Sequence, residues 1–467
     1  MSEHFYLTID QGGHASRASL FDHSLTLVNQ AACDIQTLRP KACHVEHDPQ
    51  ALLQSINTAI EQTVSTTGLP SGAIIVAGIA CQRSSIACWD RSTSQPLSNI
   101  ISWQDTRASE SVISQKDLSE ITGLRPSAHY GASKIQWCTQ HLSDVKNTPS
   151  SELAIAPLMS YLLFNLLQEV PYTSDPINAS RTNLFNIHTN AWQQSLLTDY
   201  GLTTLQLPTI HPCQHNWGRL HNGTPLNIAT GDQSAALFSL GPPKPENLYI
   251  NMGTGCFLQQ VIPKPLNNPD PLLNSLAMST EQDKIFVLEG TVNGAGSAID
   301  WFIKDRSYPE FFDTIALLLT QQVNPGICLN GISGLGSPDW KPAFTPVFID
   351  STGINNQAVA LLESILFLLQ RNIDAFSSKI EPAQNIILSG GFSQQNSICQ
   401  RLSDLSQKRV YRYSDAEATS RGLAYLLNPI DKYSFKPCIF SPKKNTALMS
   451  RYQKWTTAMH IHTKQMI

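Results

Sequence analysis

Apolar and polar positions alternate along the first 35 residues in the manner of β-strands. This alternation predicts strands at 5–10, 18–22 and 26–35, joined by short turns. A wholly apolar run at 73–82 (AIIVAGIACQ) predicts another strand, buried on both faces. Antiparallel strands that precede a buried parallel strand indicate an α/β sheet distinct from strict βαβ alternation.

The segment 48–64, which separates these strands, has the periodicity of an amphipathic helix. One face carries the apolar side chains of Leu52, Leu53, Ile56 and Ile60. Asp48 is placed to cap the N-terminus of this helix, and Pro49 suits the first helical position. The first part of the chain is therefore predicted to run strand, strand, strand, helix, strand.

A similar order recurs in the second half of the chain, which indicates an internal duplication. The predicted elements are a strand–turn–strand unit at 247–262, a strand at 284–290, a long helix at 358–380, a buried strand at 385–391 and a helix at 418–428. The Pro- and Gly-rich stretch at 239–247 marks the seam. We therefore predict two domains, 1–240 and 241–467.

Composition narrows the class of protein without naming its chemistry. The 467 residues are 41% hydrophobic and 15% charged, as in a folded globular protein. A net charge of -4 provides no basic field for a nucleic-acid partner. No signal peptide or 18-residue apolar run occurs, and the ten cysteines form no CxxC pair. These features predict a cytoplasmic protein with reduced cysteines and no membrane partner.

The turn DQGGHAS at 10–16 is the first candidate for chemistry. Asp10 ends a strand, and two glycines follow it in the turn. Backbone N–H groups of such a turn can face phosphate oxygens, and a lone carboxylate suits Mg²⁺, which binds few carboxylates together with phosphates. A plain hairpin loop explains this stretch equally well when it is taken alone.

Two further glycine turns open or close strands of the second half. GTGCF at 253–257 repeats the strand–glycine–strand pattern, so the two turns can hold one phosphate chain between them. LSGG at 388–391 ends a buried strand, and the missing side chains leave room for a flat group such as a purine. A turn leading into a helix is the alternative for the last of these.

Three other residues point to phosphoryl transfer onto a sugar-like acceptor. Asp232 follows an apolar strand and precedes an apolar run at 233–240 that predicts a helix, so it can accept a proton from an attacking hydroxyl. Arg83 leaves a buried strand and can donate to hydroxyls, and Trp103 can form an apolar wall. A helix cap, an ion pair and a core tryptophan are the structural alternatives.

At this point the sequence resembles the FGGY carbohydrate kinases, and within them the glycerol kinase branch. The resemblance is carried by nine blocks in order, namely DQGGHASRASLFD, GIACQRSSIACWDRSTSQPLSNIISWQDTR, SKIQW, GDQSAALF, NMGTGCF, EGTVNGAGSAIDWF, SGLGSPDWKP, SGGFSQQN and EATSRGLAYL. It implies two actin-like (ribonuclease-H-like) ATPase domains. ATP and Mg²⁺ would lie in the cleft between them, with the substrate and first phosphate loop in the first domain and most nucleotide contacts in the second.

The resemblance also implies a role for individual residues. Asp232 is similar to the catalytic base, and Asp10 to the carboxylate that faces the metal. The implied substrate-binding residues are Arg83, Ser84, Trp103, His129, Asp232 and Gln233. The implied nucleotide-binding residues are Gly12, Gly13, His14, Ala15, Ser16, Arg17, Thr254, Gly296, Asp300, Gly390, Gly391 and Gln395.

The chain departs from the glycerol kinases at positions that matter for substrate choice. A Thr-Thr-Ser run of the first phosphate loop is Gly-His-Ala at 13–15 here. Ser84 stands where glycerol kinases carry glutamate, His129 aligns with their substrate tyrosine, and Gly131 replaces a Pro, Ser or Thr. Buried polar mismatches of this kind cost roughly 1–3 kcal/mol each, so a different acceptor is expected.

We therefore expect an ATP-dependent kinase that phosphorylates a primary hydroxyl of a small sugar or polyol. A ketopentose or longer polyol and a glycerol-like polyol both remain open as acceptors. The altered first phosphate loop also fits a non-catalytic sugar or nucleotide sensor on the same fold. Assembly as a homodimer is left open by the sequence.

Overall fold

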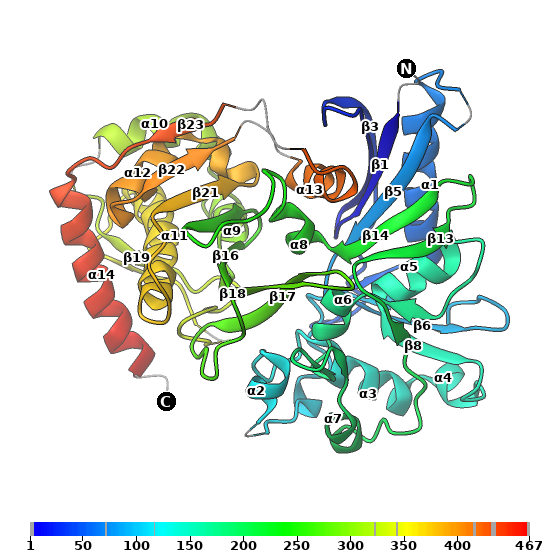
Figure 1. Cartoon of the computed structure of the whole chain (residues 1–467). Coiled ribbons are helices and arrows are strands. Elements are labelled where there is room, and N and C mark those ends of the chain that lie inside the picture. Colours follow the sequence, from blue (N-terminus) through cyan, green and yellow to red (C-terminus); the bar gives the residue numbers. More distant parts are fainter. Residues whose placement is uncertain are drawn as a thin grey trace.

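The computed structural model describes residues 4–70, 72–115, 117–321, 324–341, 344–413, 417–430 and 436–464. Two β-sheets, one built from each half of the chain, form two lobes that lie side by side (Figure 1). Helices cover the sheets, so the architecture is α/β. The helix α14 lies on the side of the second lobe that faces away from the first (Figure 1).

The first sheet has six strands in the order β13-β14-β5-β1-β2-β3. In chain order their bounds are Phe5–Gln11 (β1), Ala15–Phe21 (β2), Leu27–Asp34 (β3), Ile74–Cys81 (β5), Gln214–Arg219 (β13) and Pro225–Gly231 (β14). β1, β5 and β14 are parallel neighbours, and β2 and β3 continue antiparallel from β1. The predicted order of three antiparallel strands, a helix and a buried parallel strand is confirmed.

Local signals explain the helix α1 (Pro49–Ser65) that covers this sheet. The Asp48 side chain accepts a hydrogen bond of 2.8 Å from the backbone N–H of Ala51, which is the predicted N-terminal cap. Leu52 and Ile56 are fully buried against the sheet, whereas Leu53 is only partly buried. The apolar face thus supplies the packing that holds the helix in place.

The second sheet has seven strands in the order β17-β18-β16-β15-β21-β22-β23. Their bounds are Asn247–Met252 (β15), Cys256–Ile262 (β16), Leu273–Ser279 (β17), Lys284–Val292 (β18), Asn385–Ser389 (β21), Arg409–Arg412 (β22) and Cys438–Phe440 (β23). Its central part β18-β16-β15-β21-β22 repeats β3-β2-β1-β5-β14 in order and direction. This shared topology supports the predicted internal duplication.

Shorter elements and the remaining helices complete the fold. The minor strands are Glu46–His47 (β4), Ile86–Asp90 (β6), Ile100–Ile101 (β7), Leu153–Pro157 (β8), Thr173–Ser174 (β9), Phe185–Asn186 (β10), Ala191–Trp192 (β11), Thr209–Ile210 (β12), Ile327–Leu329 (β19) and Val347–Ile349 (β20). The helices are Leu118–Thr122 (α2), Gly131–His141 (α3), Ser143–Asn147 (α4), Leu158–Leu166 (α5), Pro176–Ser180 (α6), Gln194–Asp199 (α7), Asp232–Ala236 (α8), Gly296–Arg306 (α9), Phe311–Gln321 (α10), Ile354–Ser377 (α11), Asn396–Ser406 (α12), Ala418–Leu427 (α13) and Thr446–Lys464 (α14).

Two helices link the lobes. α13 comes from the second half of the chain, yet it packs against β1 and β5 of the first sheet and against α8 (Figure 1). Its Gly422 lies so close to α8 that an added Cβ would meet the Ala235 carbonyl oxygen. α8 ends at Ala236, so the helix predicted over 233–240 is wrong in length. Phe238 and Ser239 instead donate to carbonyls three residues back, in turns.

All ten cysteines are free, and seven of them are buried. Within the described ranges, no helix is both long and apolar enough to cross a membrane.

Candidate active site

The three residues expected to carry the chemistry converge at one edge of the first sheet. β14, β5 and β1 are adjacent and parallel. Asp232 and Arg83 follow the carboxyl ends of β14 and β5, and Asp10 is the penultimate residue of β1. Ligands of open α/β sheets bind at such an edge. Gly231 is required here, because a Cβ at this position would lie 2.6 Å from Arg83 side-chain carbons.

Both carboxylates at this edge have raised pKa values. Burial raises the pKa of Asp10 to about 7, and the charges of Asp232 and Glu417 add to the rise, while Arg17 opposes it. Burial also raises the pKa of Asp232, although Arg83 lies with its Nε 3.7 Å from Asp232 Oδ1. A cation beside Asp10 would lower its pKa and favour the ionised carboxylate.

Glu289 of β18, in the second lobe, binds arginines of the first. Its Oε2 lies 3.4 Å from Arg83 Nη1 and 2.6 Å from Arg181 Nη2, and Gln259 Nε2 donates to the same oxygen at 3.2 Å. Although burial opposes it, the two arginines lower the pKa of Glu289 to about 2. Sequence reasoning missed this residue; its signal was a lone carboxylate inside the apolar strand IFVLEG.

The predicted acceptor side contains unused polar groups. The Ser84 Oγ and Gln82 Oε1 atoms are buried and find no hydrogen-bond partner among the described residues. Ser84 also has a left-handed backbone (φ 66°), a strain that is typical of functional sites. Such groups require a partner when buried, and a substrate hydroxyl would supply one.

Two rings stand beside these groups. The rings of Trp103 and His129 meet edge to face at 5.5 Å between centroids. Burial, together with the charges of Lys134 and two arginines, lowers the pKa of His129 to about 3. The imidazole is therefore neutral at pH 7, with one donor and one acceptor nitrogen.

The first predicted phosphate loop is a tight hairpin turn between β1 and β2. Gly12 N–H donates to the Ala15 carbonyl at 3.0 Å, and His14 at the tip is exposed. The Ser16 side chain turns away into the core, where its Oγ lies 2.8 Å from Ser55 Oγ. Only the backbone of Ser16 is thus available to a nucleotide, and its hydroxyl is not.

Arg17, the last residue predicted for this loop, is engaged by acidic side chains. Its Nη1 lies 3.0 Å from Glu417 Oε2 and 3.9 Å from Asp10 Oδ2. Because Glu417 immediately precedes α13, this ion pair also ties the first lobe to the second-half segment.

The second predicted phosphate loop is braced by the start of α9. Thr254 is exposed at its tip, and its carbonyl accepts hydrogen bonds from the N–H groups of Ala295 and Ser297. A Cβ on Gly296 would lie 2.8 Å from the Gly253 carbonyl oxygen, so only glycine allows this contact. Asp300 is exposed further along α9.

The third glycine turn follows β21. Gly390 has φ 91°, and a Cβ there would lie 2.4 Å from the Met252 carbonyl oxygen. Gly391 is exposed, and Gln395 is the half-buried residue that precedes α12. β15 and β21 are parallel neighbours, so this turn and the second phosphate loop lie at the same sheet edge.

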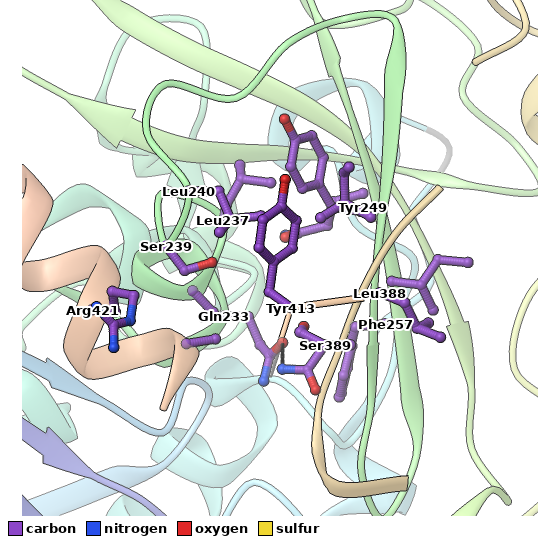
Figure 2. Close-up of a pocket in the computed structure, with 16 residues that line it drawn as sticks. Gln233, Leu237, Ser239, Leu240, Tyr249, Phe257, Leu388, Ser389, Tyr413 and Arg421 are labelled. Carbon is purple, nitrogen blue, oxygen red and sulfur yellow. Dashed lines mark hydrogen bonds between the residues drawn. The ribbon is translucent and has the colours of Figure 1, made fainter. Parts of the chain in front are cut away.

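A pocket lies between α8 and α13 on one side and β15, β16 and β21 on the other (Figure 2). It reaches the predicted acceptor residues only through Gln233, whose Oε1 accepts from Asn251 Nδ2 at 3.2 Å (Figure 2). Tyr249, Tyr413 and Arg421 line its other parts. The other acceptor residues lie outside this pocket.

The residues present fit ATP and Mg²⁺. Asp10 is a largely buried carboxylate whose pKa is raised to about 7, and glycine turns follow β1 and β15. Among the described residues, no group of three or more His, Cys, Asp or Glu side chains could hold a metal by itself. Mg²⁺ takes one or two carboxylates and completes its shell with phosphates and water, so a single carboxylate such as Asp10 can serve it.

Gly131 explains one departure from the family pattern. An added Cβ would lie 2.9 Å from Ile86 Cδ1 and 3.2 Å from Thr182 Cα and Cβ. A Pro, Ser or Thr would therefore force its neighbours apart. The Thr182 backbone sets the firmer limit, because Ile86 Cδ1 is the end of a flexible side chain.

Family models match both halves of the chain. The N-terminal domain model of the FGGY family of carbohydrate kinases matches residues 5–239, and its C-terminal domain model matches residues 248–428. A glycerol kinase of Trichlorobacter lovleyi is 32% identical over 445 residues, covering 90% of this chain and 89% of its own. A glycerol kinase of Shewanella sp. (strain MR-7) is 28% identical, covering 98% and 99%.

Solved structures share the whole architecture. Plasmodium falciparum glycerol kinase with ADP has a TM-score of 0.86 at 23% identity, covering 98% of each chain. Ligand-bound xylulose kinase from Lactobacillus acidophilus has a TM-score of 0.84 at 17% identity, again covering 98% of each. The chain therefore belongs to the FGGY family of carbohydrate kinases, ATP- and Mg²⁺-dependent phosphotransferases with two actin-like domains, as the nine sequence blocks predicted.

Proposed function

We propose that this kinase phosphorylates a primary hydroxyl of an uncharged ketopentose or a polyol of similar length. The observation that carries this proposal is the convergence of Asp232, Arg83 and Asp10 at one sheet edge, beside the Ser84 hydroxyl, which has no hydrogen-bond partner among the described residues. The similar proteins are named glycerol kinases and xylulose kinases, and these two names define the range of candidate acceptors.

Asp232 acts as the general base in this proposal. Its Oδ1 accepts the Gln233 N–H at 2.7 Å, which fixes the carboxylate at the start of α8. Burial raises its pKa and so makes it a stronger base, while the nearby Arg83 opposes part of that rise. Phosphoryl transfer depends chiefly on positioning and on charge stabilisation, and this placement provides the first.

The phosphate side is assigned to the two loops and Asp10. Amides near Gly13 and Thr254 would hold the phosphate chain, and Asp10 would hold Mg²⁺ directly or through water. Mg²⁺ supplies neutralisation of phosphate charge when it is bound. The turn after β21, with Gly390 and Gly391, would face the adenosine.

The acceptor side is assigned to Arg83, Gln233, Ser84, Trp103 and His129. Glutamate accepts two hydroxyl protons, whereas Ser84 offers one small hydroxyl and leaves space for a longer molecule. Arg83 is held by Glu289 and donates in a fixed orientation. Neutral His129 suits an uncharged acceptor.

Ser84→Ala is expected to raise the KM for the acceptor about 3- to 10-fold, because one neutral hydrogen bond is worth roughly 1 kcal/mol. The ATP KM should not change. Ser94→Ala is the matched control, since Ser94 has a similar backbone (φ 61°) and is exposed. Steady-state kinetics measure both constants, and an unchanged acceptor KM would remove Ser84 from the site.

Gly13→Thr is expected to lower the ATP KM about 3- to 10-fold by adding one hydroxyl contact to phosphate. A Cβ at Gly13 would meet Gln82 Oε1 at 3.6 Å and Trp103 Nε1 at 3.9 Å, both ordinary contacts, so the protein should fold unchanged. The same change at His14 provides a second variant. If neither alters the ATP KM, side chains in this turn do not contact the nucleotide.

An ADP-release assay across glycerol, pentitols and pentuloses, with and without each compound, tests the proposed function. Release stimulated by a pentulose or pentitol above that by glycerol is expected. A preference for glycerol would contradict the proposed acceptor. Silence on every compound would instead favour the non-catalytic sensor.

Cytoplasmic location is part of the proposal, supported by ten free cysteines. Homodimer formation stays a prediction.

A further inference from the structure

Lys134, on α3, is a fully buried lysine in the first lobe. Its Nζ donates to three backbone carbonyls, those of Ser84 at 3.2 Å, Ser102 at 2.8 Å and His129 at 2.9 Å. An ammonium group has three donors and no acceptor, so these bonds use all of its hydrogens.

The three carbonyls come from three separate segments, and each segment carries a residue that is assigned to the acceptor site. Ser84 follows β5 and His129 precedes α3, and both are assigned to the acceptor site. Ser102 follows β7 and immediately precedes Trp103, which belongs to the same site. The buried Lys134 thus joins the three segments between β5 and α3 that carry the acceptor-site residues Ser84, Trp103 and His129.

The arrangement costs stability, which argues against a role in packing alone. Burial lowers the pKa of Lys134 to about 7, and the buried Asp105 offsets this only in part. Burying a charge is expensive, and an apolar side chain of similar volume would often serve a core equally well. The ammonium also holds the carbonyl of Ser84, whose left-handed backbone needs support from its surroundings.

We propose that Lys134 is a positioning residue that sets the relative placement of Ser84, Trp103 and His129 for the acceptor. This inference rests on the proposed acceptor site. It assigns Lys134 no contact with the substrate. Its effect is therefore carried by the backbone of the residues that do make contact.

Lys134→Met tests the proposal, because methionine has a similar volume and no donor. We expect the acceptor kcat/KM to fall by on the order of 10²-fold, since misplacement of about 1 Å can cost that much. The ATP KM and the ADP release without acceptor should stay unchanged. Lys134→Arg, which keeps the charge and the donors, should recover part of the loss. Lys146→Met, an exposed lysine on α4, is the matched control.

Each outcome is decisive. An unchanged acceptor kcat/KM in folded Lys134→Met would overturn the proposal, and so would equal losses in the acceptor and ATP constants. Failure of both Lys134 variants to fold, measured by thermal denaturation, would also overturn it, because the bonds would then serve the whole lobe. If the wild-type enzyme phosphorylates none of the acceptors, the proposed function itself is wrong. The proposal for Lys134 fails separately, when the wild type is active and the variants behave as described above.

Discussion

Asp232→Asn is expected to lower kcat by about 10²- to 10⁴-fold, the usual contribution of a general base. Asparagine has nearly the same size and can keep the contact to the Gln233 N–H, but it cannot take the proton of the acceptor hydroxyl. ATP binding should survive, because the phosphate loops and Asp10 are untouched. Steady-state kinetics and ATP titration of the variant measure the two effects separately.

The control for this experiment is Asp283→Asn, which makes the same change at an exposed position. It should retain wild-type kcat. If Asp232→Asn keeps turnover near that of the wild type on the preferred acceptor, the base is another residue. If ATP binding is lost as well, the role of Asp232 is to hold the nucleotide, and the assigned division of the site is wrong.

Glu289→Gln is expected to reduce the free energy of unfolding by about 3–5 kcal/mol, as when one partner of a buried ion pair is removed. The reason is that Arg83 and Arg181 would remain buried without their shared carboxylate. Urea denaturation measures the change. Glu281→Gln, with a largely exposed side chain, should stay within about 0.5 kcal/mol of the wild type.

The pH dependence of this difference follows from the sign of the shift. The pKa of Glu289 falls from 4.5 to about 2 on folding. A carboxylate with a lowered pKa stabilises the folded state fully above its unfolded pKa, and the contribution is lost as pH falls through the folded value. The stability gap between wild type and Glu289→Gln should therefore shrink between about pH 4.5 and 2. A constant gap would mean that the charge of Glu289 does not stabilise the fold.

Local signals in the sequence predicted much of the first lobe. The alternation at 5–10, the apolar run at 73–82 and the Asp48 cap each depend on neighbours within a few residues, and all three agree with the structure. The predicted length of α8 was wrong because local signals do not reveal contacts between the lobes. The apolar run after Asp232 looks helical, but Leu237 and Phe238 are buried between the lobes, and the chain turns there.

The ion pairs and the buried lysine that hold the site residues could not be predicted from local signals. Glu289 lies 206 residues from Arg83 and 108 from Arg181 along the chain, so no spacing pattern could pair them. Lys134 lay inside the block SKIQW, but its role emerges only when three distant carbonyls surround it. The sequence predicted candidate site residues, and the structure adds the contacts that hold Arg83 and Ser84 in place.

The most direct test of the account is phosphorus NMR of wild-type enzyme with ATP, Mg²⁺ and the preferred acceptor, beside the Asp232→Asn variant. We expect ADP together with a new phosphomonoester signal of the acceptor in the wild type, and no such signal in the variant over the same time. Inorganic phosphate as the only product, or a phosphomonoester formed equally by the variant, would contradict it.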